Sequence, residues 1–168
     1  MSGAAASGKA RSRRSAARLA AVQALYQMEL AGASGQRVVS EFVAERLGRE
    51  IEGERYADAD AEWFSAVVRG VEARQAEIDE KLALCLDKER RLERLEAVLR
   101  ALLRAAAFEL LACPDVPARV VISEYLDVAH AFFNGAVPGF ANGVLDHLAR
   151  AVRPGEVDGT THGRAGVR

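Results

Sequence analysis

Hydrophobic residues recur every three to four positions along almost this whole chain, a spacing that places them on one side of an α-helix. The clearest stretch runs from residue 61 to residue 110, where many Ala, Leu, Glu and Arg residues add high helix propensity. No segment shows the sustained alternation of apolar and polar residues that a half-buried β-strand requires. Half of the 168 residues are hydrophobic, so the chain can bury a core. We therefore predict an all-α fold, a compact bundle of about seven helices.

Glycine and proline mark where these helices should end. Gly32 and Gly35 stop the first helix, the segment 113–117 carries two prolines, and Asn134-Gly135 precedes the last helix. Whether the two central helices are separated near Asp87 stays open. The predicted helices span residues 12–31, 38–47, 61–86 (with a bend near Gly70), 88–112, 118–133 and 138–152.

The ends of the chain differ in composition from its middle. Residues 1–10 are mostly Gly, Ala and Ser, and residues 154–168 are polar and rich in Gly, so both are predicted to be flexible tails around a helical domain at 11–153. Residues 48–60 are charged and lack periodicity, as expected of a linker or long loop, and no role is assigned to them.

Charged residues interrupt every apolar stretch before it reaches the length of a membrane span, which excludes a membrane protein. The chain has two cysteines, Cys85 and Cys113, far apart in sequence and without the spacing of a zinc site. This cysteine usage indicates a reducing compartment and predicts a cytoplasmic protein.

The net charge of −1 hides an uneven distribution. Residues 1–28 hold five basic residues and no acidic one, whereas residues 41–62 hold eight acidic residues against three arginines. On a helix, Arg11, Arg14 and Arg18 share one face, and the apolar stripe that begins at Leu19 continues on a neighbouring face, so we expect the arginines to remain in water. Arginine suits bidentate contacts with phosphate. The basic residues predicted to bind an anionic partner are Lys9, Arg11, Arg13, Arg14 and Arg18.

No combination of residues in the sequence points to catalysis. The three histidines, His130, His147 and His162, lack the spacing of metal ligands or of a catalytic pair. No glycine-rich phosphate loop follows a strand. We therefore predict a binding protein that is not an enzyme, with no catalytic residue, metal or cofactor.

Four motifs in this order resemble the transcription antitermination factors of the NusB family, over roughly residues 11–153. They are AVQALY at residues 21–26, LRAAAFEL at 103–110, DVP at 115–117 and FANGVLD at 140–146. The resemblance implies two small helical subdomains and a protein without enzymatic activity. Members of the family bind the box A element of nascent ribosomal RNA together with NusE, a small-subunit ribosomal protein, and the complex acts on elongating RNA polymerase to promote read-through.

The same resemblance implies roles for particular residues. The basic residues from Lys9 to Arg18 would contact RNA, and Phe140 with Asn142 would add RNA contacts at the start of the last helix. Stacking on an unpaired base is a job that suits Phe140. Tyr26 would lie toward NusE. Tyr26 and Phe140 can equally serve as core aromatics, and Asn142 can serve local backbone packing.

Two other functions fit parts of the sequence. One is the helical RNA-binding module of a ribosomal RNA cytosine methyltransferase, which needs a catalytic domain of a few hundred residues elsewhere in the protein. The other is a helical dimerisation module without RNA affinity. The sequence leaves open whether the free chain is a monomer or a homodimer, which RNA sequence it prefers and which residues contact NusE.

Overall fold

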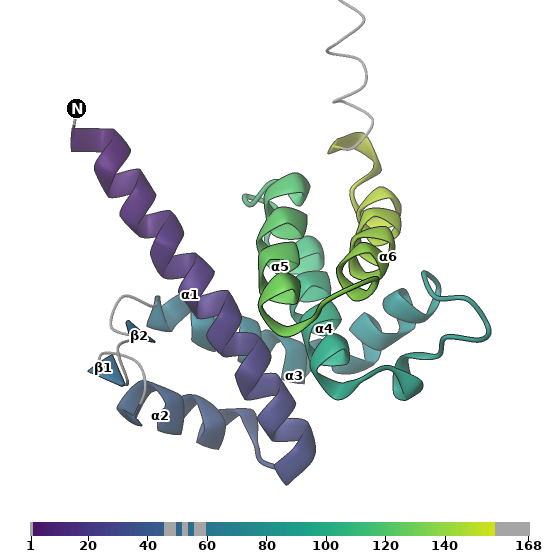
Figure 1. Ribbon diagram of the computed structural model, residues 1–168, viewed down its shortest axis with the longest axis horizontal. Helices are drawn as coiled ribbons and strands as arrows, with labels where there is room; N and C mark the ends of the chain where they lie inside the picture. Colours follow the sequence, from purple (N-terminus) through teal and green to yellow (C-terminus); the bar gives the residue numbers. More distant parts are fainter. Residues whose placement is uncertain (1, 46–49, 52–53, 56–59, 157–168) are drawn as a thin grey trace, which may run out of the picture. The chain divides into compact units, whose positions relative to one another are not determined.

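The computed structural model describes the backbone of residues 2–45, 50–51, 54–55 and 60–156, and the side chains of residues 13–45 and 60–156 (Figure 1). The described residues are helical apart from loops and one short hairpin, which confirms the predicted all-α fold. The chain divides into two compact units, Met1–Arg74 and Gln75–Arg168, in agreement with two helical subdomains. No helix in the described part of the chain is long and apolar enough to cross a membrane.

The first unit is built on α1 (Ser2–Ala31), which packs against α2 (Gly35–Glu45). Helix α1 starts ten residues earlier than the predicted start at residue 12 and ends where predicted. Gly32 follows it with φ of 64°, the left-handed conformation that glycine adopts without strain. Most of its fully buried residues are alanines, and a side chain this small lets neighbouring elements approach closely. The residues of α1 that are fully buried are Ala17, Ala20, Ala21, Val22 and Ala24.

Gly35 begins α2 instead of helping to end α1 as predicted. Its backbone N–H donates a hydrogen bond to Oε2 of Glu72 on α3 (Ala61–Ala83), over 2.5 Å. A Cβ atom at residue 35 would lie 2.7 Å from the same carboxylate, so only glycine fits without displacing it.

The segment 48–60 contains a short hairpin with two residues in each strand, in which β1 (Glu50–Ile51) pairs antiparallel with β2 (Glu54–Arg55). The other residues of this predicted linker lie outside the described residues, except Asp60. The backbone N–H of Asp60 donates to the carbonyl of Arg13 on α1 over 3.1 Å. The start of α3 is therefore tied to α1.

Helix α3 is kinked at Arg74, where φ is −114° and ψ is 18°. The division between the two units follows the same residue. The bend predicted near Gly70 thus exists but lies four residues later. Helix α3 ends at Ala83, before the predicted end at residue 86.

The second unit contains the short 3-10 turn η2 (Leu92–Arg94) and the helices α4 (Ala97–Ala112), α5 (Ala118–Phe132) and α6 (Val137–Val152). The last three pack against one another in all pairs and lie side by side in Figure 1. Helix α4 is the central one, since every residue from Ala101 to Leu110 other than Arg104 is buried. Inside this core the hydroxyl of Tyr125 donates a hydrogen bond to the carboxylate of Glu109, which is fully buried.

The predicted helix 88–112 is wrong at its beginning, because residues 88–96 form a loop and η2 despite their high helix propensity. The side chain of Arg100 accounts for the difference. Its Nη1 donates to the backbone carbonyls of Leu92, Glu93 and Leu95, at 3.2, 3.3 and 2.6 Å. These contacts satisfy carbonyls that a regular helix would otherwise pair.

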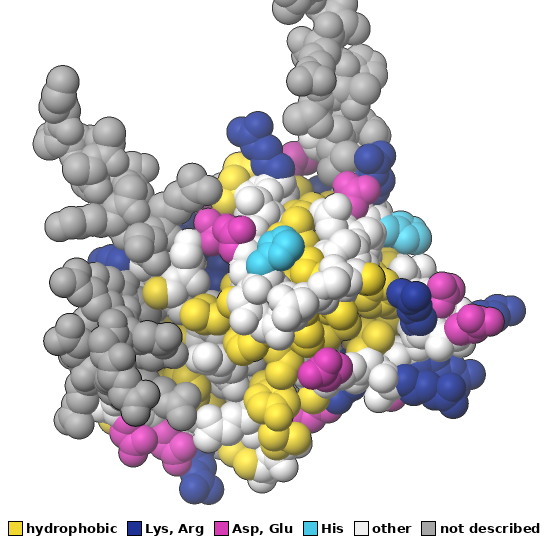
Figure 2. Space-filling model, in the orientation of Figure 1, with side chains coloured by type: hydrophobic (Ala, Val, Ile, Leu, Met, Phe, Trp, Pro, Cys, Tyr) yellow, Lys and Arg dark blue, Asp and Glu magenta, His cyan; other side chains and the backbone are white. Residues whose placement is uncertain are grey.

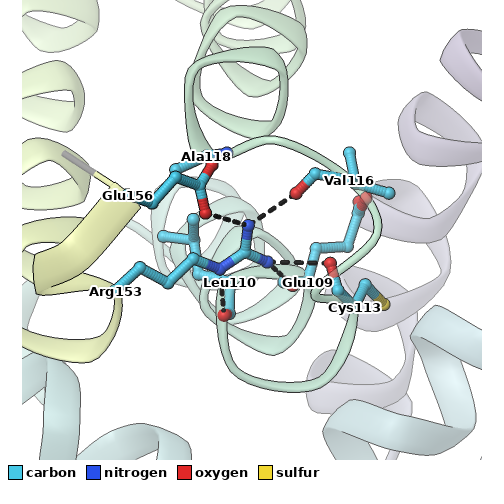
Figure 3. A network of polar contacts seen from close by, with 7 residues as sticks. All are labelled: Glu109, Leu110, Cys113, Val116, Ala118, Arg153 and Glu156. Atoms are coloured by element: carbon cyan, nitrogen blue, oxygen red, sulfur yellow. Dashed lines mark hydrogen bonds and ion pairs between the residues drawn. The ribbon is translucent and has the colours of Figure 1, made fainter. Parts of the chain in front are cut away.

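Arg153 connects α6 to the ends of α4 and α5 (Figure 3). Its Nε donates to the carbonyl of Leu110 at 2.9 Å, and its Nη2 donates to those of Glu109 and Cys113 at 3.0 and 2.8 Å. Its Nη1 donates to the carbonyl of Val116 at 2.5 Å and pairs with Oε2 of Glu156 at 3.2 Å. A guanidinium has five N–H donors, and all five are used here.

Glu156 completes this network at the N-terminal end of α5. Its Oε1 accepts the backbone N–H of Ala118, the first residue of α5, over 2.5 Å. Arg153 therefore caps the C-terminal carbonyls of α4 while Glu156 caps an N-terminal N–H of α5, each with the charge that the helix end favours. These contacts extend three residues past the predicted domain end at 153.

Candidate nucleic-acid interface

The predicted RNA-contact residues form two groups, which lie in different units. The basic residues of α1 belong to the first unit, and Phe140 with Asn142 belongs to the second. The side chains of Lys9 and Arg11 lie outside the described residues, although both residues are part of α1.

Arg13 and Arg14 are exposed on α1, at the point where the helix enters the core. The carbonyl of Arg13 accepts the Asp60 N–H, so the backbone at this point is fixed by a neighbour as well as by the helix. Two exposed guanidinium groups on a fixed helix can meet an anionic surface without a large change in shape.

Arg18 corrects the expectation that all arginines of the block remain in water, because only 2% of its surface is exposed. Arg14, Arg18, Ala21 and Leu25 share one face of α1, and that face passes into the core. The Cζ of Arg18 lies 5.6 Å from the ring centroid of Trp63 on α3, and the Cζ of Arg14 lies 4.2 Å from the same centroid. Both distances are within the range of a cation–π contact.

Trp63 is a residue that the sequence did not single out. It lies 45 positions after Arg18, and neither periodicity nor charge connects the two. A single aromatic residue near the start of an amphipathic helix is usually a core residue. The separation of Arg18 from the other arginines could not be found without knowing what packs against α1.

Tyr26, the predicted partner-contact residue, is half-buried on α1. Part of the ring packs into the first unit, and part stays accessible. Both readings of this residue, core tyrosine and contact residue, therefore keep some support in its position. Leu30, one turn after Tyr26, is 65% exposed and does not belong to the core.

Phe140 and Asn142 lie in the first turns of α6 (Val137–Val152), where Phe140 is half-buried and Asn142 is exposed. The Cζ of Arg90 lies 4.8 Å from the centroid of the Phe140 ring. Arg90 comes from the loop between α3 and η2, where its N–H donates to the Asp87 carboxylate at 3.1 Å. Residues 134–145 carry no charge of their own, so Arg90 brings a positive charge to this corner from elsewhere in the chain.

The loop that carries Arg90 is rich in charge of both signs. Its exposed basic residues include Lys88 and Arg91, and the exposed Glu89 lies between them in the sequence. Figure 2 shows Lys and Arg side chains next to Asp and Glu side chains at this edge. A pocket of about 450 Å³ lies elsewhere in the same unit, between α5 and α6, and Ile122 and Asp146 are among its lining residues.

Cys85 lacks the environment of a reactive thiol. Cys85 and Cys113 are both partly buried and form no disulfide, and burial raises the pKa of the Cys85 thiol. A raised pKa lowers the thiolate fraction at neutral pH. Within the described part of the chain, no three His, Cys, Asp or Glu side chains are grouped so as to hold a metal ion.

Comparison with protein families shows a match to the model described as the NusB family, over residues 15–150. Among relatives, the transcription antitermination protein NusB of Nitrobacter winogradskyi is 54% identical over 144 residues, covering 86% of this chain and 89% of that protein. The protein of the same name from Caulobacter vibrioides is 52% identical over 140 residues, covering 83% of this chain and 94% of that protein. The matched family region begins after Arg13 and Arg14.

Solved structures give the same result at lower identity. NusB from T. maritima superimposes with a TM-score of 0.68 at 28% identity, covering 82% of this chain and 90% of that one. A chain from the crystal structure of antitermination factors NusB and NusE in complex with dsRNA superimposes with a TM-score of 0.68 at 27% identity, covering 83% of this chain and 97% of that one.

Proposed function

This chain belongs to the NusB family, and from that membership we propose that it is an RNA-binding transcription antitermination factor. It binds the box A element of nascent ribosomal RNA together with NusE, and the complex acts on elongating RNA polymerase to promote read-through. The role is one of binding and not of catalysis. This role places the protein in the cytoplasm, where bacterial RNA polymerase works.

The observation that carries the proposal is the pair of exposed arginines, Arg13 and Arg14, on the helix whose next turn enters the core at Ala17. Arginine pairs with phosphate through two parallel hydrogen bonds, and an exposed pair on one rigid helix positions these bonds in advance. Lys9 and Arg11 extend the same positive charge along α1. The similarity to a NusB chain crystallised with NusE and dsRNA supports both partners.

Phe140 and Asn142 form the second part of the proposed RNA surface. Phe140 is partly exposed and can stack on an unpaired base, and the exposed Asn142 amide can donate to and accept from a base edge. Arg90 adds a cation beside them. Tyr26 offers its accessible part to NusE.

The methyltransferase alternative needs a catalytic domain of a few hundred residues. The two relatives compared above are covered over 89% and 94% of their own length, which leaves no room in those proteins for such a domain. The antitermination factor is therefore the better-supported function for this chain.

The test is the affinity of the full chain for a box A RNA, with and without NusE, for the unaltered protein and for the double variant R13A/R14A. We expect the double variant to bind more weakly, with a salt dependence shallower by roughly 0.7 per lost phosphate contact on a single strand. The control R37A/R69A removes two exposed arginines of the same unit and the same total charge. Unchanged affinity and salt dependence of R13A/R14A would contradict the assignment of this helix.

A further inference from the structure

The ring of Trp63 lies beside one exposed and one buried arginine of α1, Arg14 and Arg18. We propose that Trp63 is a positioning residue for RNA binding, which holds the Arg14 guanidinium in place for its phosphate contact. The inference rests on the proposed function. It adds a residue that does not itself touch RNA, on a helix that carries none of the predicted RNA contacts.

The two arginines are four positions apart, so they project from the same side of α1 toward the same ring. Arg14, at 4.2 Å from the ring centroid, has the closer contact and stays exposed. Arg18, at 5.6 Å, is only 2% exposed. The ring therefore contacts both the guanidinium that solvent can reach and the one that the core has enclosed.

The backbone that carries the Trp63 ring is anchored. The Trp63 backbone N–H donates to Oδ1 of Asp60 at 3.0 Å, and the Asp60 N–H donates to the carbonyl of Arg13 at 3.1 Å. The next residue, Phe64, is fully buried and stacks on Phe42 of α2, with centroids 5.3 Å apart. The first turn of α3 is thus anchored on both sides, and one of its anchors is the backbone of the arginine block.

The indole Nε1 gives a second indication of what the ring is for. It is buried and has no hydrogen-bond partner among the residues that the structure describes, although a buried N–H is normally paired. The Trp63 side chain therefore makes its contacts through the face of the ring and not through the indole N–H. This fits a cation–π role, because tryptophan gives the strongest cation–π contact of the aromatic residues.

A held guanidinium matters for RNA affinity because a free arginine side chain loses conformational entropy when it binds phosphate. Contact with the ring restricts the Arg14 side chain before RNA arrives, so less entropy is lost on binding. Loss of the ring should weaken RNA binding only through Arg14.

The experiment measures the affinity of the full chain with NusE for a fluorescein-labelled box A RNA, in the variants W63L, W63F, R14A and W63L/R14A. We expect W63L to bind roughly fivefold more weakly, in line with a partly desolvated cation–π contact. W63F, which keeps a ring and removes the unpaired N–H, should recover most of the affinity. The double variant should bind as weakly as R14A alone.

A control cycle pairs W63L with R37A, whose arginine lies on α2, and its effects should add. Thermal unfolding of each variant shows whether it is folded, and W63F carries the test if W63L is not. Trp63 is the only tryptophan of the chain, so its fluorescence should change when unlabelled RNA binds the unaltered protein and change less in R14A.

Additive losses for W63L and R14A, or a W63F variant that keeps its fold and binds as weakly as R14A, would overturn the positioning role while leaving RNA binding intact. Absence of RNA binding by the unaltered chain with NusE would overturn the proposed function and the positioning role with it.

Discussion

Arg104 on α4 holds Asp79 on α3 through two parallel hydrogen bonds, Nε to Oδ1 at 2.8 Å and Nη2 to Oδ2 at 2.9 Å. The arginine side chain is 14% exposed and the aspartate side chain 31% exposed, so water screens the pair only partly. Both residues belong to the second unit. The pair fixes the last part of α3 against the central helix of that unit.

We expect R104K to lower the free energy of unfolding by about 1–2 kcal/mol, because lysine cannot make both bonds at once. Urea unfolding of the two proteins measures the difference. R37K changes an arginine that is 73% exposed and paired with Glu41, and it should cost less than about 0.5 kcal/mol. Equal effects of the two substitutions would contradict a special role for the partly buried Arg104–Asp79 pair.

R153A should destabilise the protein much more than R150A, the alanine substitution of the other arginine at this end of the chain that the structure describes. It leaves carbonyls of Glu109, Leu110, Cys113 and Val116 without the donor they share, and we expect a loss of about 3 kcal/mol. R150A is the matched control on α6, since Arg150 is exposed and pairs only with Asp146 among the contacts seen for it, and it should cost about 0.5 kcal/mol or less. A loss for R153A no larger than that for R150A would rule out the capping role.

Glu156 should give the protein an acid-sensitive contribution to stability. The hydrogen bond from the Ala118 N–H, with help from Arg153, lowers the pKa of Glu156 below its ordinary value of 4.5, against a smaller opposing effect of burial. The unfolded chain therefore binds the proton more readily than the folded one. The contribution is fully present above about pH 4.5 and is lost as the pH falls through the lowered pKa.

The variant E156Q cannot titrate, so its free energy of unfolding should fall less steeply than that of the unaltered protein as the pH drops below about 4.5. Chemical unfolding at a series of pH values measures both slopes. Identical slopes would mean that the carboxylate has the same proton affinity in the folded and unfolded chain.

R90A should weaken binding of box A RNA, because it removes the cation that lies 4.8 Å from the Phe140 ring. We expect roughly a threefold to tenfold loss, typical of one partly exposed cationic contact. R94A, which removes an exposed arginine of η2 from the same segment, should lose less. A titration by fluorescence anisotropy compares the two, and a larger effect of R94A would place the RNA away from Phe140.

The helical architecture could be predicted from the sequence because it depends on the spacing of hydrophobic residues and on local breaks. Gly32 and the segment 113–117 ended helices as predicted, and the helix 118–133 differs from α5 by a single residue. The loop at 88–96 could not be predicted, because its helix propensity is overridden by Arg100, which binds its carbonyls from the following helix.

The burial of Arg18 is the part of the candidate interface that could not be predicted from the sequence. The prediction followed the large apolar residues of α1 and gave no weight to Ala17, Ala20, Ala21 and Ala24, which bury more of the helix than a single stripe would. Backbone carbonyls, which are the partners of Arg100 and Arg153, leave no trace in the side-chain pattern. Such sites are visible only once the helix ends are placed in space.

The network around Arg153 has a consequence for how this chain can be shortened. Among the residues whose side chains the structure describes, the last buried hydrophobic one is Ala149, and the match to the NusB family ends at residue 150. A chain trimmed there would retain every hydrophobic side chain described above as buried and still lose Arg153 and Glu156, the two charged groups that cap the end of α4 and the start of α5. The true boundary of the folded unit is set by hydrogen bonds to the backbone and lies at Glu156 or beyond.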